Sequence, residues 1–191
     1  MATKQTARSK KQKPVSKRDL PDIDIHRLLS LIPLFPHHTI GIFPSGDGTS
    51  FTIPIAKSVF YGSVNAINYH KKMLDQTKES LMKIKLTNVE LNLTKNNTLS
   101  IDHNSLDGMV LPFPKQEIPN IQTILKEIPK FLKNLGWIVV IEWHKHKTPS
   151  GPPQTKRISE STLRSYLEKV GFRFVSYRNF SENYYMLLMR K

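Results

Sequence analysis

The sequence contains no cysteine among its 191 residues. Disulfide bonds, thiolate metal sites and cysteine nucleophiles are therefore excluded. Long apolar runs are also missing, because stretches such as residues 137–141 are far too short to cross a bilayer. No apolar segment follows the basic N-terminus in the way that a signal peptide requires. We therefore expect a soluble protein without membrane contacts, in the cytoplasm or alternatively in the nucleus.

Acidic residues are scarce, with 15 Asp and Glu against 29 Lys and Arg and a formal net charge of +14. Residues 1–19 alone hold seven basic side chains and a single acid, Asp19. Such a segment has too little apolar surface to fold by itself. The sequence predicts a disordered basic tail over residues 1–20 and one ordered domain over residues 21–191. A tail of this charge suits nucleic acid or an acidic partner, and it also suits plain solvation.

The ordered part alternates short apolar strands with amphipathic helices, after a first helix predicted at residues 22–32. Ser159 is a typical N-cap for the last helix, and Gly171 follows its end. Pro129 lies inside another helical pattern, where we expect a kink or break. The predicted strands are 39–43, 63–67, 89–93, 107–111, 137–142, 172–177 and 185–190, and the predicted helices between them are 51–59, 69–84, 121–135 and 159–170.

Strands separated by helices pair in parallel through right-handed crossovers. The last two predicted strands are joined by residues 178–183, which are too few for a helix, so this pair should be antiparallel. We therefore predict an α/β fold: a Rossmann-like seven-stranded sheet, mostly parallel with the last strand antiparallel, and helices on both faces. In such a sheet a ligand lies beyond the carboxyl ends of the strands.

Four local stretches, in order along the chain, carry a resemblance to one enzyme family. They are FTIPIAK at 51–57, SLDGMVL at 105–111, LKNLGWIVVIEW at 132–143 and TPSGPPQTKRIS at 148–159. Together with the predicted strand pattern, they are similar to the class I S-adenosylmethionine-dependent methyltransferases, and within these to the UbiE-like branch. The resemblance runs from residue 22 to residue 191. It implies S-adenosylmethionine as the cofactor and an unidentified, small methyl acceptor as the partner.

The resemblance implies a cofactor site around the stretch GIFPSGDGTSF at residues 41–51. The family places an acid at the end of the first strand and three glycines after it. Here Phe43 stands at the acid's position and Ser50 at that of the third glycine. Asn68 replaces the acid that ends the second strand, and Asn97 is the polar residue offered after the third. The cofactor-binding residues predicted in this way are Phe43, Gly46, Asp47, Gly48, Ser50, Asn68, Asn97 and Leu111.

Three positions that are acidic in the family are therefore neutral in this chain. Uncharged acceptors bind hydroxyl groups more weakly than carboxylates do. If each lost bond costs roughly 1 kcal/mol, the affinity for the cofactor falls by about two decades. Two hypotheses follow: a methyltransferase that still uses S-adenosylmethionine, or a catalytically degenerate binding protein with a methyltransferase fold.

No catalytic residue can be assigned from the sequence, because methyl transfer depends on alignment more than on acid–base groups. Gln116, Glu117 and Glu142 are candidates to face the acceptor, with a solvated position as the alternative for each. Histidines 37–38 and 144 and 146 lack the companion ligands of a metal site, so we predict no metal. Residues 145–157 form either a lid over the acceptor or an ordinary connecting loop.

The N-terminal tail contains TKQTAR at residues 3–8, which is identical to part of the histone H-three tail. This resemblance implies that Lys4 could be methylated by a histone-modifying enzyme and then bound in an aromatic cage. The alternative is coincidence in a basic leader, or an added tag. The basic residues 8–18 are also a candidate nuclear import signal or phosphate-binding arm.

Overall fold

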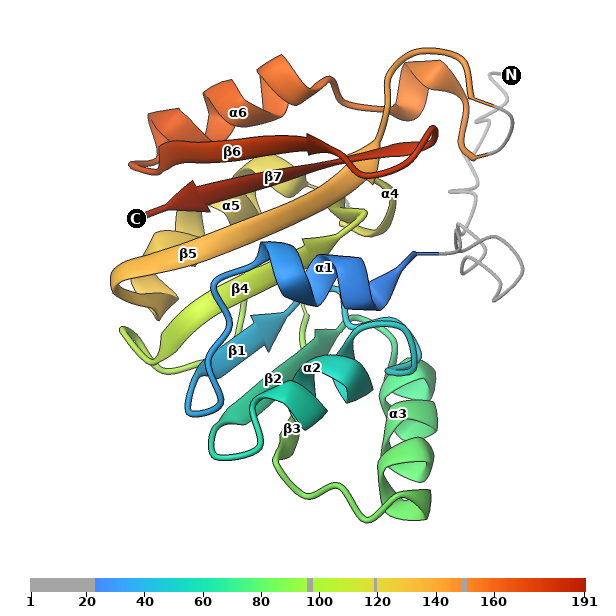
Figure 1. Ribbon diagram of the computed structural model, residues 1–191, viewed down its shortest axis with the longest axis vertical. Helices are drawn as coiled ribbons and strands as arrows, with labels where there is room; N and C mark the ends of the chain where they lie inside the picture. Colours follow the sequence, from blue (N-terminus) through green and yellow to red (C-terminus); the bar gives the residue numbers. More distant parts are fainter. Residues whose placement is uncertain (1–22, 96–97, 119, 149–150) are drawn as a thin grey trace, which may run out of the picture.

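A computed structural model describes residues 23–95, 98–118, 120–148 and 151–191. It contains a seven-stranded sheet whose strands are β1 (Thr39–Ile42), β2 (Ser63–Asn68), β3 (Val89–Leu93), β4 (Leu106–Pro112), β5 (Leu132–Trp143), β6 (Arg173–Asn179) and β7 (Tyr184–Arg190). Their order across the sheet is β3-β2-β1-β4-β5-β7-β6 (Figure 1). The pairs from β3 to β5 are parallel, and β7 is antiparallel to both of its neighbours. This confirms the predicted Rossmann-like sheet with a reversed last strand.

Helices cover both faces of this sheet. They are α1 (Ile25–Leu31), α2 (Thr52–Ser58), α3 (Lys71–Lys83), α4 (Pro114–Glu117), α5 (Ile121–Phe131) and α6 (Glu160–Lys169), with a 3-10 turn η1 at Gln154–Lys156. In Figure 1, α1 and α2 lie in front of the sheet and α5 lies behind it. These layers form because each central strand carries apolar side chains on both of its faces, so both faces of the sheet must be covered by helices.

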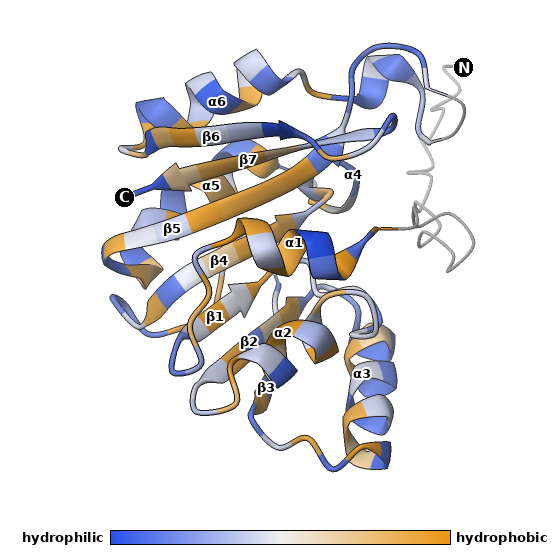
Figure 2. Cartoon of the chain, in the orientation of Figure 1, coloured by the Kyte–Doolittle hydropathy of each residue, from blue (hydrophilic) through white to orange (hydrophobic). Residues whose placement is uncertain are grey.

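The alternation is clearest on β4 and β5, which are orange along most of their length in Figure 2. Met109 and Leu111 belong to the core packed against α5 and α6. Val110, between them, belongs to the core packed against α1 and α2. Two continuous apolar cores therefore fix the sheet between its helical layers and leave the strand ends as the places for polar chemistry.

The region around α5 differs from the prediction. We expected a helix from residue 121 to 135 with a kink or break at Pro129, but α5 continues through Pro129 and ends at Phe131. Strand β5 then begins at once, because Leu132 already pairs with Leu106. Leu135 adopts a left-handed φ of 61°, which no helix accepts. The short helix α4 was also not predicted; Pro114 occupies its first turn.

Candidate functional site

The segment between β1 and α2 crosses the carboxyl ends of the central strands. The backbone N–H of Phe43 donates to the Val110 carbonyl on β4 at 3.0 Å. The N–H of Ser45 donates to the Ile67 carbonyl on β2 at 2.8 Å. The following glycine turn is thereby held at the edge where an open parallel sheet binds its ligands.

Glycine is required in this turn for two different reasons. Gly46 and Gly48 both have positive φ, at 60° and 80°, which side chains disfavour. A Cβ on Gly48 would also lie 2.5 Å from Cγ2 of Thr77 on α3. The turn between β1 and α2 is therefore packed directly onto α3, and its shape is fixed by that contact.

An aromatic pair lies where the sequence resemblance predicts the first acid of the family. Phe43 is fully buried, and its ring centroid lies 5.2 Å from that of Tyr69, just after β2. Tyr69 is half-buried, and this burial raises the pKa of its hydroxyl group. Aromatic faces attract cations through their ring quadrupole. The rim therefore offers aromatic surface here in place of a carboxylate.

Asn68 and Asp47 are both engaged in holding the turn. The Asn68 side chain is buried; its Oδ1 accepts from the N–H of His70 at 2.9 Å, and its Nδ2 lies 3.5 Å from the Gly46 carbonyl. Oδ1 of Asp47 accepts from the N–H and the hydroxyl of Thr49, at 3.0 and 2.7 Å. Asn68 thus links β2 to the glycine turn, and one oxygen of Asp47 is committed to closing it.

The other predicted site residues lie at different distances from this centre. Leu111 is fully buried in β4, where it pairs with Val140. Ser50 is exposed beyond the turn. Asn97 and Lys4 lie outside the described residues. The structure therefore brings Phe43, the two glycines and Asn68 together at one edge and places Ser50 on the surface beside them.

Two hydroxyls on either side of the glycine turn are buried without a hydrogen-bond partner among the described residues. They are Oγ of Ser45 and Oγ1 of Thr52, whose residues are 1% and 0% exposed. A buried hydroxyl that makes no hydrogen bond costs about 1–3 kcal/mol. Both oxygens are inaccessible in this conformation, so a polar ligand would satisfy them only after the turn moved to expose them. Ser45 lies inside the predicted motif, but a sequence pattern carries no signal that a hydroxyl is buried without a partner, so neither hydroxyl could be predicted.

Glu142 ends β5 as a fully buried carboxylate. Its two oxygens accept the backbone N–H groups of Lys115 at 2.9 Å and Trp143 at 2.8 Å. Burial raises the pKa of Glu142 to about 7, although both N–H groups and the charges of Lys115 and Arg157 oppose the shift. The predicted candidate Glu142 therefore fastens α4 to β5, and it is not exposed to an acceptor in this conformation.

The segment from His144 to Arg157, called the strap below, leads from β5 towards α6. The buried guanidinium of Arg157 donates from Nη1 to the carbonyls of His144 and His146, at 2.9 and 3.1 Å, and from Nε to that of Pro152 at 2.7 Å. Gln116 of α4 donates to the Lys156 carbonyl at 3.2 Å. The predicted lid or loop is therefore fastened at several points beside α4. Arg157 belongs to the fourth sequence stretch, but its contacts with His144 and His146 lie outside that stretch, so the sequence did not predict its role.

The histidines that were considered as metal ligands have other neighbours. His144 is buried and stacks on His146 with ring centroids 4.7 Å apart, and its burial lowers the pKa of its imidazole. In the described part of the chain, no group of three or more His, Asp or Glu side chains is placed to hold a metal ion. The described helices also include none that is long and apolar enough to span a membrane.

A model of the ubiE/COQ5 methyltransferase family matches residues 42–151, which is more than half of the chain. The chain belongs to the ubiE/COQ5 methyltransferase family. The matched region begins in β1 and includes the glycine turn, the aromatic pair and Glu142, so the family assignment covers the site just described. The UbiE-like resemblance inferred from the four sequence stretches is confirmed.

Solved structures share the fold of this ubiE/COQ5 family member. A SAM dependent methyltransferase from Aquifex aeolicus superposes with a TM-score of 0.83 at 24% identity, over 91% of this chain and 95% of that one. A SAM-dependent methyltransferase from Methanosarcina mazei gives a TM-score of 0.69 at 16% identity, over 91% and 98%. The [4+2]-cyclase SpnF gives 0.74 at 16% identity, over 86% and 80%. At these identities the likeness establishes the fold. Curated protein sequences give no match.

S-adenosylmethionine is the cofactor that membership of this family implies. The residues at the rim fit it without carboxylates. The unpaired hydroxyls of Ser45 and Thr52 and the amide of Asn68 suit the polar groups of an adenosyl amino acid. The ring of Tyr69 suits its sulfonium. The family member therefore keeps the glycine turn, with the carboxylate of Asp47 inside it, and the other polar groups named here beside the turn are neutral.

Proposed function

We propose that this ubiE/COQ5 family member transfers a methyl group from S-adenosylmethionine to a small acceptor. The observation that carries the proposal is the pair of unpaired, buried hydroxyls beside the glycine turn, inside the region that the family model matches. A methyltransferase fold alone would not suffice, because one fold serves many functions.

The cofactor supplies a methyl group on a sulfonium, and the protein contributes binding and alignment. Ser45, Thr52 and Asn68 would hold its polar groups, and Gly46 and Gly48 allow its close approach to the backbone. Asn68 accepts from the His70 N–H, so one lone pair of its oxygen remains for a ligand hydroxyl. Neutral contacts of this kind give a weaker site than three carboxylates would.

The acceptor would lie between the glycine turn and α4. Phe113, just before α4, has a left-handed backbone with φ of 50°, and its N–H donates to the Ile141 carbonyl at 2.8 Å. Glu142 then holds the first turn of α4 through the Lys115 N–H. Gln116 links the same turn to the strap. We assign Glu142 and Gln116 as positioning residues, which fix the wall that an acceptor would touch.

Titration calorimetry of the full chain with S-adenosylmethionine tests this proposal. Saturable binding at one site is expected, and S45A should weaken it about fivefold because a hydrogen bond contributes roughly 1 kcal/mol. Since Oγ of Ser45 has no hydrogen-bond partner in the described part of the chain, its removal should not lower stability. S58A is the matched control: Ser58 also lies near α2, but its hydroxyl donates to the Pro54 carbonyl, and binding should be unchanged. No heat at millimolar ligand would end the proposal.

The basic tail remains a separate proposal, because Lys4 lies outside the described residues. Its histone-like sequence supports modification by a histone-lysine methyltransferase, and its charge supports contact with nucleic acid. A peptide of residues 1–20 incubated with such an enzyme and labelled cofactor should gain one label, and K4A should gain none. An unlabelled wild-type peptide would reject this role without bearing on cofactor binding by the domain.

A further inference from the structure

A second cavity lies at the opposite edge of the sheet from the glycine turn. Its volume is about 200 Å³, and it opens among the residues before β1, the beginnings of β4 and β5, and the end of β7. These are the amino ends of the parallel strands, so the cavity is separated from the proposed cofactor site by the length of the sheet. The residues that matter here are Phe35, Asp107, Lys133, Leu135, Trp137 and Arg190.

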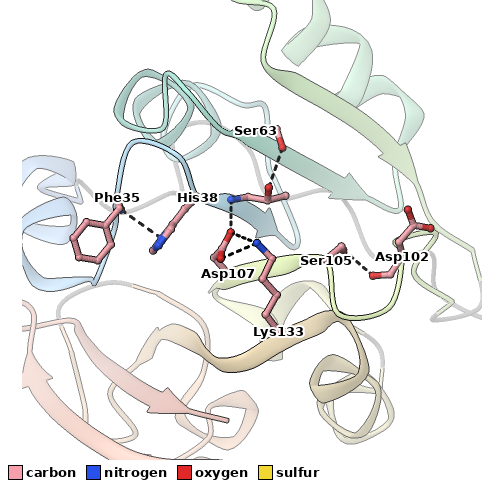
Figure 3. Close-up of polar contacts among 8 residues, drawn as sticks. Phe35, His38, Ser63, Asp102, Ser105, Asp107 and Lys133 are labelled. Carbon is pink, nitrogen blue, oxygen red and sulfur yellow. Dashed lines mark hydrogen bonds and ion pairs between the residues drawn. The ribbon is translucent and has the colours of Figure 1, made fainter.

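The charges in the cavity leave one cation without a counter-ion. Figure 3 shows the Asp107 carboxylate accepting from Nζ of Lys133, at 2.9 and 2.8 Å, and from the N–H of Thr39 at 2.8 Å. Burial alone would raise the pKa of Asp107, but these bonds and the Lys133 charge outweigh it and lower the pKa. Asp107 and Lys133 therefore neutralise one another. The guanidinium of Arg190 makes no hydrogen bond or ion pair with any described residue.

A buried donor lies in the same wall. Trp137 is 3% exposed, and its indole Nε1–H has no hydrogen-bond partner in the described part of the protein. Trp137 and Arg190 are direct partners in the β5–β7 ladder. The cavity therefore brings together an exposed guanidinium and a buried, unsatisfied N–H on neighbouring strands, and one carboxylate can accept from both.

The rim of the cavity is apolar and partly strained. Phe35 is 55% exposed and Leu135 is 67% exposed. Leu135 also has a φ of 61°, a backbone conformation that glycine adopts more readily than a residue with a side chain. Exposed apolar groups and strained backbone are found more often at ligand-binding sites than elsewhere on a protein. The same rim would cover the apolar part of a small ligand.

We propose that this cavity binds a small organic carboxylate, with the carboxylate on Arg190 and Trp137 and a short apolar or aromatic body against Phe35 and Leu135. The planar guanidinium matches the two oxygens of a carboxylate. The volume lies below the range of about 300–1,000 Å³ that is usual for larger ligands, so the body must be small. Inorganic phosphate lacks the apolar body that would contact Phe35 and Leu135, so it gains less from this cavity than an organic carboxylate does.

Nuclear magnetic resonance of the ¹⁵N-labelled full chain tests this site with benzoate as the probe. The sequence contains two tryptophans, so two indole signals are expected, and W137F assigns them. Benzoate should shift the Trp137 indole signal and saturate. Benzamide, which has the same shape without the charge, and inorganic phosphate should each bind at least about tenfold more weakly.

Two variants and one control complete the test. R190M should weaken benzoate binding at least about tenfold by removing the bidentate cation. R178M removes the same residue type from the far end of β6, where Arg178 is exposed and pairs with Met186, and it should leave binding unchanged. L135D should also weaken binding, because it adds a like charge at an exposed rim position. No saturable shift with benzoate, an equal response to phosphate, or unchanged affinity in R190M or L135D would overturn the proposal.

Discussion

Restoring a carboxylate at the end of β2 should strengthen cofactor binding. The sequence resemblance assigns Asn68 to the position of the ribose-binding acid, and we propose that it has that role; its Oδ1 already accepts from the His70 N–H at 2.9 Å. In N68D one oxygen keeps that bond, and the second becomes a charged acceptor for a ligand hydroxyl. The substitution also removes the hydrogen bond from Nδ2 to the Gly46 carbonyl, but that bond is weak because it is 3.5 Å long. A charge-assisted bond gains roughly 1 kcal/mol over a neutral one, which is about a fivefold tighter dissociation constant.

The assay is titration calorimetry with S-adenosylmethionine at pH 8, where the new Asp is ionised, together with a denaturation curve for each variant. N65D is the control, because it adds the same charge to β2 three residues earlier, where Asn65 faces Asn92 instead of the glycine turn. N65D should leave affinity unchanged. Equal or weaker binding by folded N68D would refute the assignment of Asn68 to the ribose position.

Two further predictions concern stability. The folded-state pKa of Glu142 is about 7, above its ordinary 4.5, so its contribution to stability is full below pH 4.5 and is lost as pH rises through 7. The free energy of unfolding of wild type relative to E142Q should therefore fall by roughly 3 kcal/mol between pH 4.5 and 8. Chemical denaturation of both proteins across this range measures the difference. A difference in unfolding free energy that does not change with pH would contradict the prediction. L135G should raise the free energy of unfolding by about 1 kcal/mol by relieving the positive φ of an exposed residue, whereas L135A should not, and equal curves for both would show that the strain is negligible.

The strands of the sheet and their directions could be predicted because they follow from local sequence patterns. Apolar runs separated by amphipathic helices imply parallel crossovers, and the short link 178–183 implies an antiparallel last pair. The glycine turn was predicted for the same reason, since Gly46 and Gly48 follow a buried strand directly. The end of α5 was placed too late, because apolar residues at 132 and 135 continue the helical pattern. Their strand pairing and left-handed backbone become visible only in three dimensions.

Most of the site's chemistry depends on partners far apart in the sequence. Glu142 was a candidate, but the Lys115 N–H that it accepts lies 27 residues away. The unpaired state of Ser45 and Thr52 is a property of their surroundings, which no motif describes. The cavity at Arg190 was not predicted at all, because its groups come from four separate segments. Sequence patterns predicted which edge of the sheet would hold a cofactor, and packing decides which polar groups remain there for a ligand.

A crystal structure of the full chain with S-adenosylhomocysteine, the demethylated cofactor product, tests the central claim most directly. The account predicts the ligand at the carboxyl edge of the sheet, with polar atoms within hydrogen-bond distance of Ser45 and Asn68 and the adenosyl group beside Gly46 and Gly48. A ligand bound elsewhere, or crystals grown at saturating ligand in which this edge is closed by the Phe43 and Tyr69 rings, would contradict it.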